Sequence, residues 1–283
     1  MRRNLQILAS IARIALAVVV ALPFVLYFSQ DRLIFQLQPM NEAGLAMIKK
    51  ALPQAKEIWI SAADGTRLHG WFAPARGTGR APSLIYFGGN AENVSGALLD
   101  APAVPAVAFF AMNYRGYGLS EGKPSEAALF ADALAIYDHV VARPDVDPAQ
   151  IIVLGRSLGS GVATYLAANR PVRGVILVTP YDSVTAVAER KYPFMPIRWL
   201  LKHPFDSQSR APLIKAPALI LAAGDDTLIP PVHAERLLAS WGGPRRIVTL
   251  RGVDHDTVDG HADYWPQIRS HLQQIGIAVQ APR

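Results

Sequence analysis

The residues in this chain best suited to chemistry are Gly155-Arg156-Ser157-Leu158-Gly159, in which a serine lies between two glycines. An apolar run rich in β-branched residues, Ile151 to Leu154, precedes them, and a run that favours a helix, Val162 to Ala168, follows. A strand that turns sharply into a helix holds the serine hydroxyl above the sheet, because the glycines let the backbone pass close to its neighbours. A plain Ser/Gly turn is the alternative, but the strand and helix favour Ser157 as a nucleophile.

A serine hydroxyl is a weak nucleophile at neutral pH and needs a general base that a carboxylate orients. Asp225 and Asp226 follow the strand-like run Ala218 to Ala222, and catalytic groups of open α/β sheets lie beyond the carboxyl ends of strands. One of the two is expected to be the acid and the other a turn or cap residue. Asp182, after the preceding strand, is an outside alternative.

For the base, His255 follows the last strand candidate, Arg246 to Leu250, and precedes the final helix. The order serine, acid, histidine is one of the known orders of a catalytic triad. Of the seven histidines, only His261 competes on chain order, and it lies farther from the strand end. We therefore expect His255 to be the base.

Acyl transfer also needs hydrogen-bond donors for the oxyanion. The N–H of Leu158, directly after the serine, is one candidate, and Gly88-Gly89-Asn90-Ala91, after the strand that ends at Phe87, offers the N–H of Asn90 as the second. A glycine-rich turn that caps a helix is the simpler interpretation, and it is compatible with this role.

Other chemistries lack the residues that they need. The chain has no cysteine, so it offers no disulfide, no cysteine-ligated zinc and no thiol nucleophile. It has no H-E-x-x-H, G-x-G-x-x-G or Walker motif, and we expect neither a metal nor a cofactor. Arg2, Arg3 and Arg13 supply half of the formal net charge of +6, and no basic cluster interleaves with aromatic residues. Nucleic acid is therefore not an expected partner.

Strand-like and helix-like runs alternate along the chain, which predicts a mostly parallel sheet with helices on both faces. The expected strands are 58–60, 68–72, 83–87, 107–112, 151–154, 175–178, 218–222 and 246–250, and the expected helices are 93–100, 125–142, 158–169, 231–241 and 262–275. The first two strands flank Asp64-Gly65, which predicts an antiparallel hairpin. The sheet should have eight strands.

The N-terminal segment is strongly apolar, since Arg13 is the only charge between Leu5 and Phe28. Such a stretch is long enough for a transmembrane helix. The arginines before its apolar core place the N-terminus in the cytoplasm and the remaining chain outside, facing the periplasm if the source is bacterial. A cleaved signal peptide is the alternative, with Val19-Val20-Ala21 as the passable cleavage site. We expect an uncleaved, single-pass anchor.

These signals divide the chain into an anchor at 1–30, a connector at 31–55 and a catalytic domain at 56–283. Leu45, Ile48 and Leu52 share one helical face of the connector. Within the domain, 184–217 is too long and too apolar for a plain crossover loop. It is expected to be a short insertion after the sixth strand that acts as a lid over an acyl chain, with a crossover helix packed on the sheet as the alternative.

Together the motifs resemble a known family. Four segments carry the resemblance: Tyr86 to Ala91, Asn113 to Gly122, Gly155 to Gly161 and Asp226 to Pro230. The chain from Ile58 to Leu272 resembles the membrane-anchored α/β-hydrolases of the bud-emergence type, which are related to the serine hydrolases that remove palmitate from proteins.

The resemblance implies an α/β-hydrolase fold with Ser157, Asp226 and His255 as the triad, because the family places its acid four residues before a proline. The loop from Tyr114 to Gly118 should be scaffold. One position departs from the family, which usually has histidine where this chain has Gly88.

We therefore expect a cofactor-independent serine hydrolase that cleaves esters or thioesters of lipid-like acyl substrates through an acyl-enzyme. A membrane-anchored serine peptidase or aminopeptidase of the same fold is one alternative. A catalytically silent envelope protein that binds lipid or a partner is the other. The sequence leaves the oligomeric state open.

Overall fold

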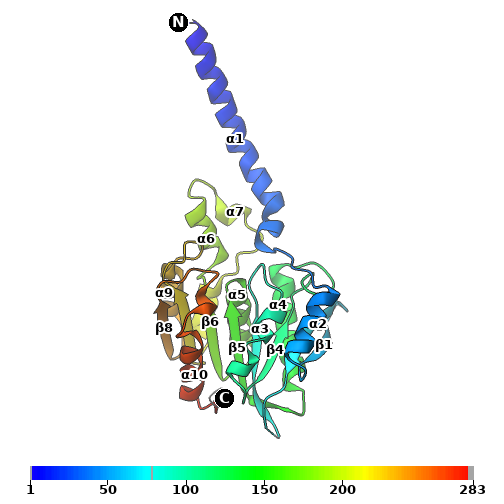
Figure 1. The fold of residues 1–283 in the computed structure, drawn as a ribbon. Helices are drawn as coiled ribbons and strands as arrows, with labels where there is room; N and C mark the ends of the chain where they lie inside the picture. Colours follow the sequence, from blue (N-terminus) through cyan, green and yellow to red (C-terminus); the bar gives the residue numbers. More distant parts are fainter. Residues whose placement is uncertain (1, 78, 280–283) are drawn as a thin grey trace.

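The computed structural model describes residues 2–77 and 79–279, which form one α/β domain and a helix that projects from it (Figure 1). The domain is built on an eight-stranded sheet in the order β1-β2-β4-β3-β5-β6-β7-β8. The strands are β1 (Lys56–Ser61), β2 (Arg67–Ala73), β3 (Ala81–Phe87), β4 (Ala108–Met112), β5 (Val146–Arg156), β6 (Gly174–Val178), β7 (Ala218–Ala223) and β8 (Arg245–Leu250). The pairs β1–β2 and β2–β4 are antiparallel and the other pairs are parallel, so the predicted sheet is confirmed.

Helices cover both faces of the sheet. The described helices are α1 (Arg2–Ile34), α2 (Glu42–Ala51), α3 (Ser95–Leu98), α4 (Glu126–Val141), α5 (Leu158–Asn169), α6 (Val184–Lys191), α7 (Ile197–Leu200), α8 (Ser207–Arg210), α9 (Pro231–Ser240) and α10 (Tyr264–Gln274). Helices α4, α5 and α9 pack on one face, and α2, α3 and α10 on the other. The arrangement is the α/β-hydrolase fold that the sequence predicts.

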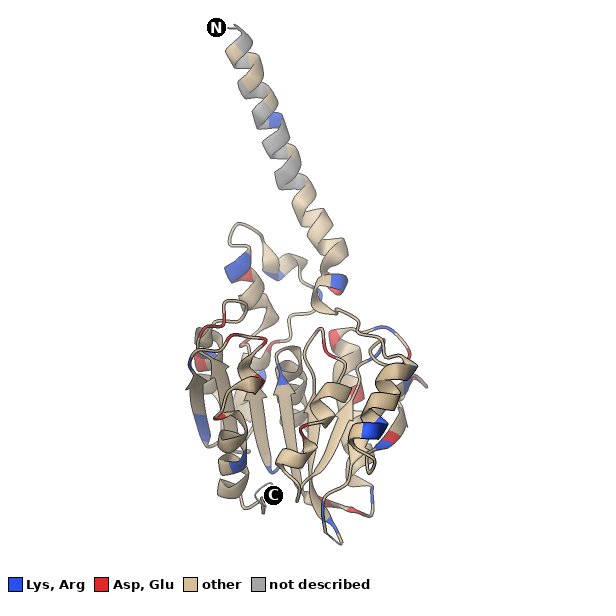
Figure 2. Cartoon of the chain, viewed as in Figure 1, with Lys and Arg blue, Asp and Glu red and all other residues tan. Residues whose placement is uncertain are grey.

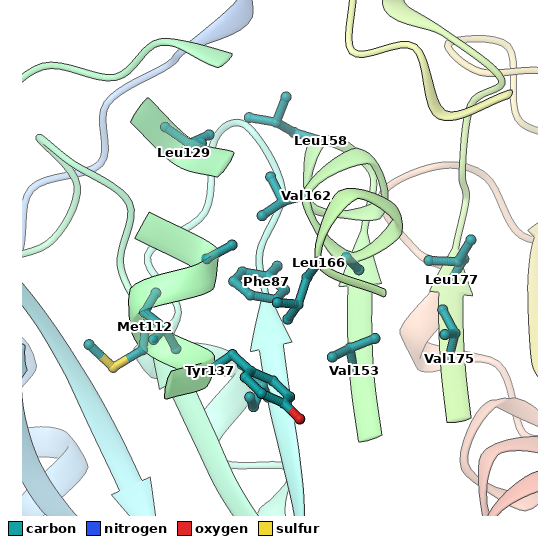
Figure 3. Close-up of a cluster of buried hydrophobic side chains, with 14 of the residues drawn as sticks. Phe87, Met112, Leu129, Tyr137, Val153, Leu158, Val162, Leu166, Val175 and Leu177 are labelled. Atoms are coloured by element: carbon teal, nitrogen blue, oxygen red, sulfur yellow. The ribbon is translucent and has the colours of Figure 1, made fainter. Parts of the chain in front are cut away.

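The side chains of β5 alternate between two apolar cores. Val153 packs under α5 with Val162 and Leu166, as Figure 3 shows, whereas its neighbours Ile152 and Leu154 belong to the core on the opposite face. All the residues from Ile151 to Gly155 are buried. A strand covered on both faces needs apolar residues at every position, which explains the continuous apolar run before the serine.

Two expected helices differ from the structure. The helix predicted at 93–100 is only α3, followed by a 3₁₀ turn at Ala101–Ala103, because Pro102 lacks the N–H that would continue the α-helix. The segment 184–217 contains α6, α7, α8 and a 3₁₀ turn at Ala211–Leu213, and no side chain of α6 is buried. It therefore does not form one helix packed on the sheet.

The apolar N-terminal segment forms most of α1, which continues to Ile34, beyond the expected end of the anchor at residue 30. In the part of the chain that the structure describes, no helix is long and apolar enough to cross a membrane. Several side chains of the predicted anchor, that of Leu5 among them, lie outside the described residues. The transmembrane helix thus stays a prediction. In the connector, Ile48 and Leu52 are buried against the sheet.

Candidate active site

The serine lies at the junction between β5 and α5. Ser157 has φ +49° and ψ −118°, a backbone conformation that residues other than glycine rarely adopt. The turn is tight, because a Cβ at Gly155 would meet the carbonyl of Gly159, and one at Gly159 would meet the carbonyls of Phe87 and Gly88. The two glycines therefore allow α5 to begin directly against the end of β3, and this contact holds the serine at the carboxyl edge of the sheet.

Asp226 and His255 meet Ser157 at this edge, from the loops after β7 and β8. The Nε2 of His255 lies 2.9 Å from the Oγ of Ser157, and its Nδ1 lies 2.7 Å from the Oδ2 of Asp226. The other oxygen of Asp226, Oδ1, accepts hydrogen bonds from the N–H groups of Leu228 at 2.9 Å and Ile229 at 2.7 Å. The carboxylate is thereby fixed, and it orients an imidazole placed to take the serine proton.

The alternative residues lie elsewhere. Asp225 is exposed, and His261 contacts Asp263. Asp182 is buried, but its Oδ1 lies 2.7 Å from the Nδ1 of His233, which is buried as well. The structure thus brings Asp226 and His255 to the serine, and Asp182 forms a separate pair with a histidine of α9.

Both candidate oxyanion donors lie beside the serine. Leu158 is the first residue of α5, so its N–H has no acceptor within the helix. Asn90 follows Gly89, where a Cβ would lie 3.7 Å from the Cβ of Ser157. Within residues 2–77 and 79–279, neither the Leu158 N–H nor the Asn90 N–H donates a hydrogen bond to another loop or strand. Both can therefore point to a bound oxyanion.

Two tyrosines donate hydrogen bonds to the loop that carries Asn90. The hydroxyl of Tyr114 donates to the carbonyl of Gly88 at 2.8 Å, and that of Tyr117 donates to the carbonyl of Asn90 at 2.7 Å. Burial raises the pKa of both tyrosines, so they keep their protons at neutral pH. The N–H of Gln36, just after α1, donates to the same carbonyl of Asn90 at 3.0 Å. The segment from Tyr114 to Gly118 therefore supports the loop.

Glu92 is a residue of the site that the sequence did not reveal. Its Oε2 accepts the N–H of Gly89 at 2.8 Å, and its Oε1 accepts the hydroxyl of Tyr86 at 2.7 Å. A Cβ at Gly88 would lie 3.1 Å from the Cδ of Glu92. The Glu92 carboxylate thus occupies the space beside the position where the resembling family has histidine. No motif marks this role, because it depends on how the loop folds back on itself.

A cavity of about 360 Å³ lies between α3 and α10. Glu92, Asp100, Arg156 and Asp259 line it together with aromatic residues, whereas the triad residues do not. Arg156 extends from this cavity toward the triad, since its Nη2 lies 3.4 Å from the carbonyl oxygen of His255. Burial raises the pKa of Asp100 to about 6. The cavity is therefore rich in carboxylates around one arginine.

The chain is similar to several known proteins. The family model described as "Serine aminopeptidase, S33" matches residues 93–205. An uncharacterized protein of Mycobacterium tuberculosis is 34% identical over 257 residues, covering 90% of this chain and 89% of its own length. The alpha/beta hydrolase domain-containing protein WAV2 of Arabidopsis thaliana is 30% identical over 250 residues, covering 80% and 79%.

Solved structures show the same fold. Acetyl xylan esterase 1 from Thermoanaerobacterium superposes with a TM-score of 0.62 at 17% sequence identity, covering 88% of this chain and 98% of the esterase. At that identity the likeness concerns the fold alone.

The strained backbone at Ser157 leads to a stability prediction. Glycine adopts positive φ without strain, so Ser157→Gly should have a free energy of unfolding higher than that of Ser157→Ala by about 1 kcal/mol. Ser270, inside α10, is the matched control. Here Ser270→Ala should be more stable than Ser270→Gly by about 1 kcal/mol, because glycine is unfavourable within a helix. Urea unfolding measures both pairs. An alanine variant that was the more stable at position 157 would contradict the strain.

A second prediction concerns Glu92. In Glu92→Ala the N–H of Gly89 loses its acceptor and the Asn90 amide loses its fixed position, so labelling of Ser157 by a fluorophosphonate should slow by about tenfold. Glu235→Ala, on the exposed face of α9, is the control and should react like the wild type. Equal labelling rates for the two variants would show that Glu92 has no part in positioning the loop.

Proposed function

Since the chain belongs to the α/β-hydrolase family, as its relatives show, we propose that it is a serine hydrolase that cleaves carboxylic esters or thioesters of acyl substrates. The observation that carries the proposal is the continuous hydrogen-bonded series from Ser157 through His255 to Asp226. A hydroxyl so placed is activated for attack on an acyl carbon. A protein that only bound lipid or a partner would have no use for this series.

The proposed reaction has two stages, acylation of Ser157 and hydrolysis of the acyl-enzyme. The Oγ of Ser157 attacks the acyl carbon while the Nε2 of His255 takes its proton, and the carboxylate of Asp226 stabilises the imidazolium. The N–H groups of Leu158 and Asn90 stabilise the oxyanion. His255 then returns the proton to the departing alcohol or thiol, which leaves an acyl-enzyme. Water attacks this ester with His255 again as the base, and His255 then returns the proton to the Oγ of Ser157 as the free acid leaves.

The preference for acyl esters over peptides has two supports. The insertion at 184–217 is rich in apolar side chains, which suit an acyl chain. The N-terminal segment is also nearly uncharged, and Phe24, Val25 and Phe28 of α1 are exposed. We propose that α1 anchors the protein in a membrane, with its N-terminus in the cytoplasm and the catalytic domain outside.

An aminopeptidase is the second candidate. Two observations favour it: the description of the matched family model and the carboxylates of Glu92, Asp100 and Asp259 around the cavity, which could receive a substrate amine. Arg156, among these carboxylates, opposes binding of an amine, and we therefore rank this function second. Turnover of aminoacyl p-nitroanilides compared with p-nitrophenyl acyl esters of increasing chain length decides between the two.

The triad proposal is tested with a fluorophosphonate probe and a p-nitrophenyl ester. Ser157→Ala should not be labelled, and His255→Ala and Asp226→Asn should lose about 10⁴-fold in kcat. Asp225→Asn and His261→Ala are matched controls that should behave like the wild type. Labelling of Ser157→Ala at the wild-type rate would overturn the assignment, as would equal losses at Asp225 and Asp226.

The proposed topology has its own test. A periplasmic-type reporter, such as alkaline phosphatase, fused after the last residue should be active in bacterial cells, because the arginines before the apolar segment stay in the cytoplasm. An inactive phosphatase fusion, together with an active fusion to a reporter that works only in the cytoplasm, would contradict the outward-facing domain. Replacing Arg2, Arg3 and Arg13 by glutamate should lower the phosphatase signal.

A further inference from the structure

The segment 192–202, called here the aromatic segment, exposes two large side chains. Phe194 is 98% exposed and Trp199 is 89% exposed, more than any other large apolar side chain that the structure describes. Ile197, which lies between them, is buried and anchors the segment to the domain. Two exposed aromatic side chains on one short, anchored segment mark an interaction surface.

The aromatic segment is tied to the end of α1. The amide of Gln30, itself only 6% exposed, donates to the carbonyl of Leu200 at 3.0 Å and accepts the N–H of Lys202 at 2.7 Å. Asp31, the next residue, lies 3.2 Å from the Nε2 of His203. Helices α6 and α7 lie at the end of the molecule from which α1 projects, as Figure 1 shows. The aromatic segment and the inner end of α1 therefore lie side by side and form one surface at this end of the molecule.

The charges around this surface are mainly positive. Lysines and arginines of α6, of α7 and the residues just after it, and of the end of α1 gather at this end of the molecule (Figure 2). They are Arg32, Arg190, Lys191, Arg198 and Lys202. Two acidic residues lie among them, Glu189, which pairs with Arg198 at 2.8 Å, and Asp31. Aromatic side chains within a cationic rim are complementary to the headgroup layer of an anionic bilayer.

The surface adjoins the candidate active site. The aromatic segment follows β6 by way of Tyr181, whose hydroxyl donates to the carbonyl of Leu158 at 3.0 Å. On the other side, the chain that leaves α1 donates from Gln36 to the carbonyl of Asn90. Tyr181 is followed by α6, which leads to the aromatic segment, and Gln36 follows α1. The carboxyl end of β5, where Ser157 lies, points to the same end of the domain as α6 and α7 (Figure 1).

We propose that Phe194 and Trp199 insert into the headgroup layer of an anionic phospholipid bilayer, as a second membrane contact beside α1, so that acyl substrates reach Ser157 from the bilayer. This inference rests on the proposed membrane anchoring by α1. The cationic rim favours lipid over a second copy of the chain, because two copies would bring like charges together.

The chain has no cysteine, so a single introduced cysteine can report on the depth of its position in a bilayer without removal of any native cysteine. Phe194→Cys and Trp199→Cys, labelled with an environment-sensitive fluorophore in the full chain, are reconstituted with phosphatidylglycerol and phosphatidylcholine vesicles. The emission should shift to the blue and be quenched by nitroxide lipids. Ala149→Cys, exposed near the start of β5, should show neither effect. Phe24→Cys reports on the anchor separately.

Three outcomes overturn the proposal and differ from one another. Quenching at position 24 without quenching at 194 and 199 leaves the anchor intact and removes the second contact. No quenching at any of the three positions contradicts the proposed anchoring by α1 as well. A dimer that Phe194→Ser/Trp199→Ser abolishes, without quenching, assigns the surface to a second copy of the chain.

Activity gives an independent test. Phe194→Ser/Trp199→Ser should lower the rate on a long-chain p-nitrophenyl ester embedded in anionic vesicles by about tenfold, because the anchored domain is then no longer held against the bilayer in the position that receives the ester. Its rate on soluble p-nitrophenyl acetate should equal that of the wild type. Leu213→Ser, also in the insertion and 67% exposed, is the matched control. Equal effects on both substrates would contradict the proposal, and no activity on either in the wild type would instead refute the hydrolase function.

Discussion

The close approach of α5 to β3 and β5 is the constraint on which the rest of the site depends. It is possible because residues 155 and 159 have no side chain, so the first turn of the helix lies against backbone carbonyls. The chain at Ser157 must then take a strained conformation, which the packed cores on both faces of the sheet maintain. This arrangement holds the hydroxyl and the Leu158 amide in fixed positions at the same edge.

Around this fixed point, each polar group has a single orientation because its other atoms are already bonded. Asp226 uses one oxygen for two backbone amides and the other for His255. The loop at Asn90 is held through its carbonyl, which leaves its amide for a ligand. The loop at Tyr114 is fixed in turn by Arg115, which forms a buried bidentate pair with Asp132. Preorganisation of this kind avoids rearrangement during the reaction.

The sequence predicted what local signals encode. The alternation of apolar runs predicted the sheet, and the glycines at 155 and 159 with the chain order of acid and histidine predicted which segments meet at its edge. The choice of Asp226 over Asp225 came from the resemblance to a known family. Glu92 was missed because its contacts depend on the fold of a loop, and the partner of Asp182 proved to be His233 from another element. The segment 184–217 was also difficult, since Pro193, Pro196 and Pro204 divide an apolar run into short pieces.

The hydrogen bond from Gln36 to Asn90 connects the chain just after α1 to the candidate oxyanion loop. At 33 residues and 1.5 Å per residue, α1 is about 50 Å long, and Gln30, near its inner end, is bonded to Leu200 of the aromatic segment. The short stretch from Gln30 to Gln36 therefore joins the helix both to the aromatic segment and to the loop that carries Asn90, so the helix junction and the candidate active site share one piece of backbone.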